Sequence, residues 1–426
     1  MSFNTISVIG LGYIGLPTAA MFASRKKSVI GVDVNQHAVD TINRGEIHIV
    51  EPDLDMIVHA AVTEGYLRAV TSPEPADAFL IAVPTPFKSS LNNESDSAIP
   101  EPDLSYIKKA SEAIAPVLKK GDLVILESTS PVGATEQMAE WLAAARPDLS
   151  FPQAAGEEAD INVAHCPERV LPGHVVRELV ENDRVIGGMT AKCSARAVEL
   201  YKTFVQGECV ITNARTAEMA KLTENSCRDV QIAFANELSI ICDKLDIDVW
   251  ELISLANRHP RINILQPGPG VGGHCIAVDP WFIVSKTPEE AQLIHIARKV
   301  NDAKPQWVIN KVKLAIADFL QANPTKTAKD VTIACYGLAF KPDIDDLRES
   351  PALNITKQIA ELHSGTVLAI EPNIHTLPNN IAELELSTFS DAKERADIHL
   401  LLVDHKEFKA QKMNNHYLID TKGIWC

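Results

Sequence analysis

The segment from Ile6 to Asp33 constrains the fold more than any other part of the chain. It contains an apolar stretch, the pattern Gly10-Leu-Gly12-Tyr-Ile-Gly15, a helix-compatible stretch and a second apolar stretch that ends at Asp33. In a strand–loop–helix unit the first glycine permits a tight turn, the second lets a pyrophosphate approach the backbone, and the third lets helix pack on strand. The order therefore predicts a doubly wound α/β sheet with a dinucleotide at its first loop.

Asp33 indicates which dinucleotide this is. It ends the second predicted strand, roughly 20 residues after the glycines, where a carboxylate accepts hydrogen bonds from the adenosine ribose and repels a 2′-phosphate. We therefore expect NAD rather than NADP. The alternative, a glycine-rich turn with a capping aspartate, does not explain why strand, helix and acid all occur in this order.

Two more predicted strands end in polar residues. The strand 79–83 leads to Thr85, and the strand 123–127 leads to Thr129. Ligands of doubly wound sheets bind outside the carboxyl ends of strands, so both threonines are candidate cofactor contacts, although threonine is also a common turn former. The polar stretch 88–103 is predicted to be a flexible surface excursion.

Composition narrows the class of protein. The 426 residues are 46% hydrophobic and 23% charged, enough for two or three domains with cores. The net charge of −16 argues against nucleic-acid or membrane-surface partners, and the N-terminus has no signal-like segment, so a cytoplasmic protein is expected. Eight cysteines without a Cys-x-x-Cys pair or zinc spacing predict reduced thiols and no metal site.

The loop 268–275, Gly-Pro-Gly-Val-Gly-Gly-His-Cys, has too much glycine for a helix or strand interior. It delivers the thiol of Cys275, with the carboxylate of Asp279 four residues beyond. An inert cysteine at a tight turn is one reading, and a nucleophile is the other.

A long helix is predicted from Thr216 to Leu245, with Lys221, Asn225 and Arg228 on one face. A lysine in a cleft can stabilise an oxyanion or act as a base. In the segment 164–173, Glu168 is a candidate base or water holder and Arg169 a fork for phosphate or carbonyl, with a solvated salt bridge as the alternative.

The remaining chain predicts helices at 249–257, 288–302 and 305–320, a linker at 323–327, and a second, smaller doubly wound unit with strands at 330–336, 366–370, 398–403 and 417–419. This unit has Lys341, Arg348 and Lys422 near strand ends, where cations suit a nucleotide diphosphate. We expect three domains: an NAD-binding domain at 1–211, a central helical domain at 212–322 and a second, Rossmann-like nucleotide-binding domain at 323–426.

The motif order resembles the nucleotide-sugar 6-dehydrogenases across nearly the whole chain. The motifs are GxGxxG, Cys-Pro-Glu-Arg, Lys-x-x-x-Asn, Gly-x-Gly-x-Gly-Gly-x-Cys and Gly-Leu-Ala-Phe-Lys-Pro. The segments 167–173 and 259–263 resemble the N-acetylhexosamine branch, which acts in bacterial surface polysaccharide synthesis. The polar excursion after Phe87 is longer than in that family. The resemblance implies UDP-N-acetyl-D-mannosamine as substrate, with UDP-N-acetyl-D-glucosamine as the alternative.

The resemblance also implies residue roles. Cys275 is the nucleophile. Lys221 with Asn225 stabilises the alkoxide and the oxyanion, and Glu168 or Asp279 orients or deprotonates water. The implied UDP-sugar contacts are Arg169, Val170, Lys221, Asn225, Arg228, His259, Gly272, Phe340, Lys341 and Lys422. The implied NAD contacts, beside the three glycines, are Tyr13, Ile14, Asp33, Thr85, Thr129 and Arg348. Arg261 would reach the neighbouring subunit of a homodimer. The segment 262–269 that follows it contains two prolines and little to fold it back, so a loop that reaches outward across an interface is expected.

Oxidising a primary alcohol to a carboxylate removes four electrons, so two hydrides leave one carbon. An aldehyde yields its hydride only after something adds to it, and a thiolate that forms a thiohemiacetal meets this need. A two-electron hydroxyacid dehydrogenase would leave Cys275 and the C-terminal unit unexplained, and a non-catalytic NAD-sensing or UDP-sugar-binding protein would need no thiol. The three classes release two, one or no NADH per sugar.

Overall fold

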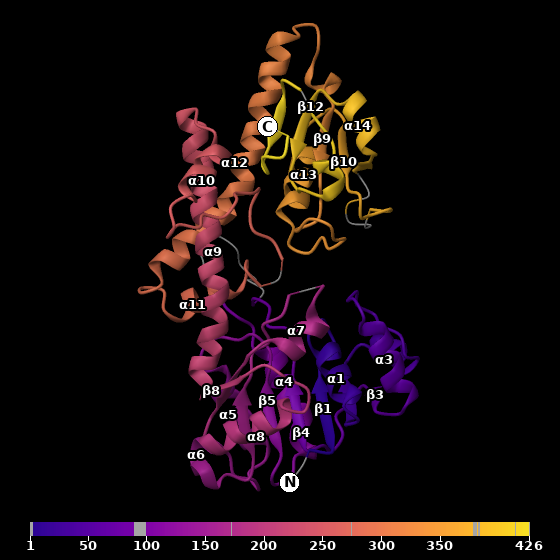
Figure 1. Ribbon diagram of the computed structural model, residues 1–426, viewed down its shortest axis with the longest axis vertical. Helices are drawn as coiled ribbons and strands as arrows, with labels where there is room; N and C mark the ends of the chain where they lie inside the picture. Colours follow the sequence, from indigo (N-terminus) through magenta and orange to yellow (C-terminus); the bar gives the residue numbers. More distant parts are fainter. Residues whose placement is uncertain are drawn as a thin grey trace. The chain divides into compact units, whose positions relative to one another are not determined.

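The computed structural model describes residues 3–88, 99–171, 173–273, 275–377, 381, 384–413 and 415–425 (Figure 1). The chain forms two compact units. The N-terminal unit comprises Met1–Glu224 and Trp281–Thr287, and the C-terminal unit comprises Asn225–Pro280 and Pro288–Cys426.

The N-terminal unit is built on an eight-stranded sheet of order β3-β2-β1-β4-β5-β6-β7-β8. Only the β6–β7 pair is antiparallel. The strands are β1 (Thr5–Ile9), β2 (Ser28–Val32), β3 (Leu67–Val70), β4 (Ala78–Ile81), β5 (Leu123–Leu126), β6 (Asn162–His165), β7 (Arg184–Gly188) and β8 (Cys209–Asn213). The predicted doubly wound sheet is confirmed, while β3, β7 and β8 were not placed from the sequence.

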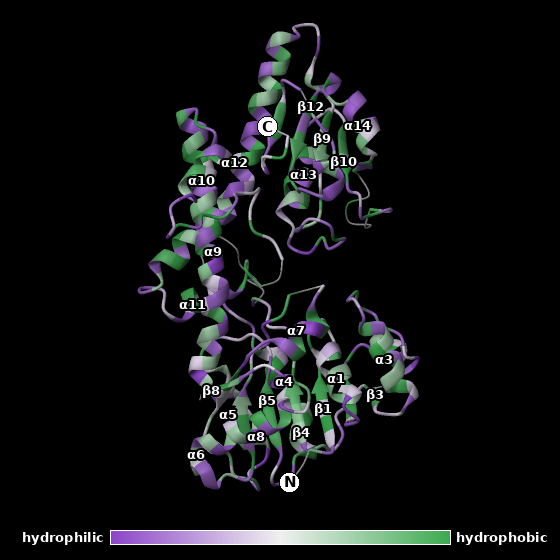
Figure 2. Ribbon diagram, viewed as in Figure 1, coloured by the Kyte–Doolittle hydropathy of each residue, from purple (hydrophilic) through white to green (hydrophobic). Residues whose placement is uncertain are grey.

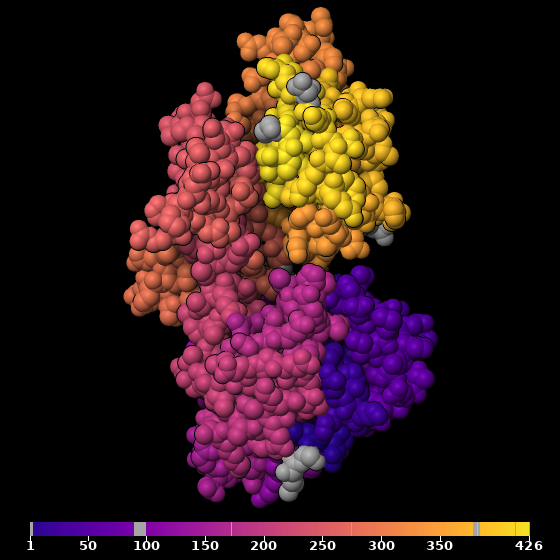
Figure 3. All heavy atoms as spheres, in the orientation of Figure 1, coloured from indigo at the N-terminus to yellow at the C-terminus, as the bar shows by residue number. Residues whose placement is uncertain are grey.

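Alternate residues of each strand pack on opposite faces of this sheet. In β4, Leu80 joins the core under α1, α3 and α8, whereas Phe79 and Ile81 join the core under α4 and α5. Burial on both faces explains why the central strands read as continuous apolar runs, green along β1, β4 and β5 in Figure 2. Figure 3 shows the first half of this unit, indigo to violet, beside the magenta second half.

Eight helices of four residues or more lie wholly within the described part of the N-terminal unit. They are α1 (Gly15–Ser24), α2 (Gln36–Asn43), α3 (Leu54–Thr63), α4 (Ser105–Ile114), α5 (Ala134–Ala145), α6 (Pro152–Ala155), α7 (Val175–Glu181) and α8 (Ala191–Tyr201).

Four further helices lie between the sheets in sequence. They are α9 (Ala214–Leu245), α10 (Val249–Ala256), α11 (Asp279–Lys286) and α12 (Gln292–Ala322). The predicted long helix is confirmed by α9.

The prediction of two helices separated at Pro305 was wrong, because Pro305 lies inside the continuous helix α12. A proline inside a helix costs about 3 kcal/mol. Buried side chains on both sides of it, among them Ala297, Val308 and Val312, favour continuing the helix by more than that.

The C-terminal unit holds a five-stranded, all-parallel sheet of order β11-β10-β9-β12-β13. Its strands are β9 (Ile333–Tyr336), β10 (Val367–Ile370), β11 (Glu385–Leu386), β12 (Ile398–Leu401) and β13 (Leu418–Asp420), and its helices are α13 (Pro351–Leu362), α14 (Phe389–Arg395) and α15 (Lys406–Lys409). Helices α12 and α13 cover one face, while Phe389 and Phe408 of α14 and α15 pack on the other. The second doubly wound unit is therefore confirmed.

Most of the predicted excursion at 88–103 lies outside the described residues. Its two ends are held together, since Lys88 N–H donates to the Glu101 carbonyl at 2.9 Å and Phe87 forms an isolated antiparallel bridge with Pro102. Among the described helices, we find none whose length and apolar character would suit a membrane span.

Candidate active site

The glycine loop after β1 has room for a ligand at its middle glycine only. A Cβ at Gly10 would lie 2.7 Å from the Ala82 carbonyl oxygen, and one at Gly15 would lie 1.8 Å from the Gly10 carbonyl oxygen. A Cβ at Gly12 would meet no protein atom within 4 Å. Gly10 also has a φ of +89°, which favours glycine. The loop is thus closed to side chains at both ends and open where a pyrophosphate approaches.

The surroundings of this loop also fit NAD. Helix α1 has no side-chain cap and no acid in its first turn, so its N-terminus favours an anion. The half-buried Asp33 accepts Leu11 N–H at 2.9 Å through Oδ2, which holds its carboxylate beside the loop. Thr85 is buried, and its Oγ1 has no hydrogen-bond partner among the described residues. Tyr13 is 37% exposed, and Ile14 and Thr129 are half-buried at the same edge of the sheet.

Glu168 belongs to a buried charged cluster that sequence reasoning missed. Its Oε2 accepts from Arg184 at 2.5 Å, and Arg184 also lies 3.5 Å from Glu127 Oε1. The Tyr201 hydroxyl donates to Glu127 at 2.5 Å. Glu168 is 8% exposed and Arg184 4%, so the solvated salt bridge considered for this segment is wrong for Glu168.

The cluster holds two carboxyl groups against one guanidinium. Burial raises the pKa of Glu127 to about 7, with Arg184 opposing the rise and Glu168 adding to it. Because Arg184 and Glu168 are both buried, water does not compete for their ion pair. Arg184 therefore holds the Glu168 carboxylate in place. The spacing of these residues along the chain gave no sign of the cluster, because Glu127 and Glu168 follow β5 and β6, Arg184 begins β7 and Tyr201 ends α8.

Arg169 and Lys221 complete the predicted residues of this unit. Arg169 pairs with Glu224 of α9 at 2.5 Å and remains partly exposed, so here the salt-bridge alternative describes the structure. Val170 packs partly buried against the apolar core. Lys221 is half-buried on α9.

In the C-terminal unit, Cys275, Asp279 and Asn225 come together. Cys275 is exposed and begins a turn in which its carbonyl accepts Asp279 N–H at 2.8 Å. Asn225 of α9 donates from Nδ2 to Asp279 Oδ2 at 2.5 Å. The turn joins Cys275 to Asp279 through the backbone, and the amide of Asn225 fixes the direction of the buried Asp279 carboxylate. No disulfide joins the seven cysteines that the structure describes.

The glycine loop before Cys275 packs closely on the loop after β9. A Cβ at Gly272 would lie 2.6 Å from the Glu349 carbonyl oxygen and 2.9 Å from Phe340 Cβ, and one at Gly273, whose φ is +79°, would lie 3.0 Å from the Phe340 ring. The glycines are needed for this close approach. The predicted substrate residues Gly272 and Phe340 are thereby in contact; His274 lies outside the described residues.

A buried polar chain, also missed from the sequence, holds the start of this loop. Gly268 N–H donates to Asn236 Oδ1 at 2.9 Å, Asn236 donates to Asn301 at 2.9 Å, and Asn301 donates to Asp229 at 2.8 Å. Arg298 pairs with Asp229 at 2.6 Å. These residues come from α9 and α12, so only helix packing reveals the chain.

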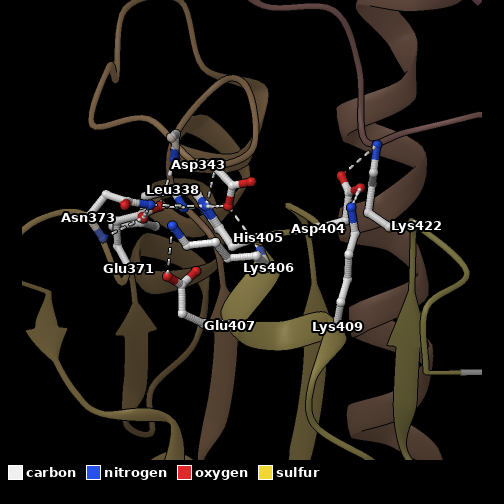
Figure 4. Close-up of polar contacts among 11 residues, drawn as sticks. Leu338, Asp343, Glu371, Asn373, Asp404, His405, Lys406, Glu407, Lys409 and Lys422 are labelled. Atoms are coloured by element: carbon white, nitrogen blue, oxygen red, sulfur yellow. Dashed lines mark hydrogen bonds and ion pairs between the residues drawn. The ribbon is translucent and has the colours of Figure 1, made fainter.

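The cations of the C-terminal unit differ in their surroundings. Figure 4 shows Asp404 between Lys409 and Lys422, at 2.8 and 3.3 Å. Burial favours the neutral carboxyl, but the two lysines outweigh it and leave the pKa of Asp404 below its ordinary value. Lys341 is exposed, and Arg348 pairs with Asp346 at 2.6 Å.

The predicted contacts Arg228, His259 and Arg261 are exposed. The expectation that little folds the segment after Arg261 back was wrong. Asn257 donates to the Ile264 carbonyl at 2.9 Å and accepts Ile264 N–H at 2.7 Å, so its amide closes residues 258–263 into a loop. Arg261 lies at the surface of this closed loop.

Comparison with known proteins agrees with this geometry. Profiles of the UDP-glucose/GDP-mannose dehydrogenase family match as an NAD binding domain at residues 4–205, a central domain at 215–303 and a UDP binding domain at 334–426. The chain is 68% identical to UDP-N-acetyl-D-mannosamine dehydrogenase of Yersinia pestis over 100% of both chains. It is 64% identical to NDP-N-acetyl-D-galactosaminuronic acid dehydrogenase of Ralstonia nicotianae, over 100% of this chain and 97% of that one.

A solved structure shares the architecture. UDP-D-ManNAc dehydrogenase of Pyrococcus horikoshii superimposes with a TM-score of 0.84 at 36% identity, covering 99% of this chain and 96% of that one. With a dinucleotide loop, a second nucleotide-binding sheet and a cysteine on a glycine loop in the family's order, the chain belongs to the UDP-glucose/GDP-mannose dehydrogenase family and is one of its NAD-dependent oxidoreductases.

Proposed function

We propose that the chain oxidises UDP-N-acetyl-D-mannosamine to UDP-N-acetyl-D-mannosaminuronate in two NAD-dependent steps, in the cytoplasm, for a bacterial surface polysaccharide of the enterobacterial common antigen type. The observation that carries the proposal is Cys275 on a closely packed glycine loop, beside Asp279 whose carboxylate Asn225 orients. A two-electron dehydrogenase needs no such thiol.

The first step turns the C6 alcohol into an aldehyde. NAD, when bound, supplies the hydride acceptor. Lys221 stabilises the alkoxide as the hydroxyl proton is lost and the hydride leaves. Asp33, the glycine loop and Thr85 orient the cofactor, and Arg348 is assigned to the same ligand.

The second step needs Cys275. Its thiolate adds to the aldehyde carbon, and the oxygen takes up a proton, which gives a thiohemiacetal. Loss of the second hydride and of the hydroxyl proton leaves a thioester. Water then adds, the carbon–sulfur bond breaks, and the carboxylate and the thiol are released. Asn225 with Lys221 stabilises oxyanion character, and Glu168 or Asp279 deprotonates the water.

The remote UDP keeps the aldehyde bound between the two steps. Phe340, Lys341 and Lys422 are assigned to the nucleotide, with Gly272 beside them. Arg169, Val170, Arg228 and His259 are assigned to the sugar side. We divide the chain into an NAD-binding domain at 1–211, a central helical domain at 212–322 and a UDP-sugar-binding domain at 323–426.

We further infer that the protein is a homodimer in which Arg261 serves the partner's substrate. Apolar side chains exposed in the C-terminal unit support a second copy as the partner: they are Phe234, Ile241 and Leu245 of α9, Leu255 of α10, and Leu293 and Ile296 of α12. On α9 the three are spaced by seven and four, so they share one face.

The reaction is tested by counting NADH per sugar for UDP-N-acetyl-D-mannosamine, UDP-N-acetyl-D-glucosamine and UDP-glucose. Two NADH per molecule of the manno sugar, with the highest kcat/KM, supports the proposal. One NADH would indicate a two-electron dehydrogenase, and preference for the gluco sugar would support the alternative substrate. The relative from Ralstonia nicotianae, named for a different amino sugar, makes this comparison necessary.

The shared site is tested by mixing two inactive variants, Arg261→Ala and Cys275→Ala, under conditions of subunit exchange. If Arg261 acts across the interface, a mixed dimer contains one site with both groups, and activity returns. If Arg261 acts within its own chain, activity stays at the level of the separate variants even though exchange is confirmed by labelled subunits.

A further inference from the structure

The loop that follows β9 carries Phe340 and Lys341, and it is tied down on both sides of them. Before them, the Leu338 and Ala339 N–H groups donate to Glu371 Oε2 at 2.8 and 3.0 Å. Glu371 follows β10 and is 5% exposed. One buried carboxylate oxygen therefore anchors the start of the loop.

The other side of the loop is tied to the segment after β12. Asp343 N–H donates to His405 Nδ1 at 2.9 Å, and Asp343 Oδ1 accepts Lys406 N–H at 2.9 Å (Figure 4). Asp343 has a φ of +63°, which is unfavourable for a residue with a Cβ. These two bonds hold it in that conformation.

His405 joins the two anchors. Its Nε2 lies 3.1 Å from Glu371 Oε2, and the imidazole is fully buried. Because a backbone N–H can only donate, Nδ1 accepts from Asp343, and Nε2 carries the hydrogen toward Glu371. The tautomer is thus fixed by the loop itself.

The same bonds exclude another use of this histidine. Asp343, His405 and Glu407 form a group of ligand-type atoms close enough to surround an ion, among the residues that the structure describes. Both ring nitrogens of His405 are already engaged, and Nδ1 also lies 3.1 Å from Asn373 Nδ2. No nitrogen lone pair remains for a metal.

We propose that His405 is a positioning residue for nucleotide binding, which clamps the loop 338–343 so that Phe340 and Lys341 face the uridine diphosphate. The inference rests on the proposed function, because it takes these two residues as UDP contacts. Phe340 also lies close to the glycine loop, through its Cβ at Gly272 and its ring at Gly273.

The test separates the contributions of the two hydrogen bonds that the His405 imidazole makes. Asn places an amide oxygen near Nδ1 and keeps an acceptor for Asp343, Gln places an amide nitrogen near Nε2 and keeps a donor for Glu371, and Leu keeps neither. The variants are His405→Asn, His405→Gln and His405→Leu in the full chain. The Kd of UDP and of NAD is measured by calorimetry, and KM and kcat with the UDP-sugar.

The matched control is His399→Leu. His399 is 1% exposed on β12 of the same sheet and bonds to the Tyr336 hydroxyl at 2.9 Å, away from the loop. Both leucine variants replace a buried histidine in the same unit, so a general loss of stability would appear in both.

We expect His405→Leu to weaken UDP by about tenfold or more and to raise the sugar's KM similarly. NAD affinity and saturated kcat should change by less than about threefold. The Asn and Gln variants should each lie between Leu and wild type, and they carry the test if the Leu variant does not fold. The His399 variant should keep its UDP affinity.

The inference is overturned if the His405 variants melt earlier yet bind UDP as the wild type does, or if His399→Leu weakens UDP equally. Either result would make His405 an ordinary core residue. A wild-type protein that binds no UDP and oxidises no UDP-sugar would instead overturn the proposed function, and this is measured in the same series.

Discussion

The two sheets of this protein begin a nucleotide loop in the same way and then use the acid beside it differently. Gly10 has a φ of +89° and donates to the Val32 carbonyl at 2.8 Å; Gly337 has a φ of +92° and donates to the Ile370 carbonyl at 2.7 Å. The next N–H donates to an acid that follows the neighbouring strand, Asp33 or Glu371.

The acids differ in what surrounds them. Asp33 is half-buried, and helix α1 begins five residues after Gly10, so the carboxylate and the helix N-terminus lie at the two ends of the same loop. Glu371 is buried and accepts from two loop N–H groups, His405 and Asn373. A half-exposed acid at this position can recognise a ribose, whereas a buried acid whose oxygens are already bonded stabilises the loop.

The largest expected effect comes from removing the thiol, which should stop the reaction and leave both nucleotide sites intact. Cys275→Ala should lower uronate formation by more than about a thousandfold, since the aldehyde cannot be oxidised without the thiol. NAD and UDP should bind as before, by calorimetry. Cys227→Ala, another exposed cysteine, is the control and should remain active. Near-normal uronate formation by the Cys275 variant would show that the reaction does not need this thiol.

Glu371→Gln should cost about 2–3 kcal/mol of unfolding free energy at pH 7, since it removes a buried charge that several donors bind. Burial favours the neutral carboxyl, but His405 and the backbone donors outweigh it and leave the pKa of Glu371 below its ordinary value. The stabilisation is therefore present above the unfolded pKa and lost as pH falls through the folded pKa.

Urea unfolding at pH 7 and pH 3 measures this difference, which should shrink at the lower pH. Asp33→Asn is the control and should change stability by less than about 1 kcal/mol, because its carboxylate is half-exposed. Equal losses of unfolding free energy in the two variants would show that Asp33 stabilises the fold as much as Glu371 does.

Asp33→Ala should lower kcat/KM for NAD by about 10- to 100-fold and narrow the preference over NADP, because both the ribose bond and the repulsion of a 2′-phosphate are removed. Initial rates with both cofactors test this, with Asp40→Ala on the exposed side of α2 as the control. If the ratio of kcat/KM for NAD and NADP does not change, Asp33 has only a structural role, like Glu371.

The smallest effect concerns Glu127, which is buried like Glu371 but poorly satisfied, since its Oε2 has no partner among the described residues. With a folded pKa of about 7, it holds a proton that the unfolded chain has lost above pH 4.5, so its contribution to stability falls as pH rises from 4.5 to 7. Glu127→Gln should therefore raise the unfolding free energy by about 2 kcal/mol at pH 9 and by little at pH 5.

Thermal or urea unfolding at pH 5, 7 and 9 checks this prediction, with the exposed Glu136→Gln as the matched variant. A destabilised Glu127 variant at pH 9 would mean that the pair with Arg184 outweighs burial. Glu127 would then be a satisfied acid of the Glu371 kind.

The sequence by itself determined what neighbouring residues enforce. Gly10, Gly12, Gly15 and Asp33 act within one strand–loop–helix–strand segment, so their spacing together with that local pattern predicted the dinucleotide loop. The period of α9 likewise placed Lys221, Asn225 and Arg228 on one face, and the glycines before Cys275 predicted a shaped loop. In each case the constraint is local backbone geometry, which a short segment carries with it.

Only the tertiary structure decided which distant side chains meet. Arg184 reaches Glu127 and Glu168 across 57 and 16 positions, and His405 reaches Glu371 and Asp343 across 34 and 62. No local period encodes these pairs, because strand order and helix packing bring them together after the chain folds. The same reason explains Pro305: helix α12 continues through it because buried contacts on both sides outweigh a local preference.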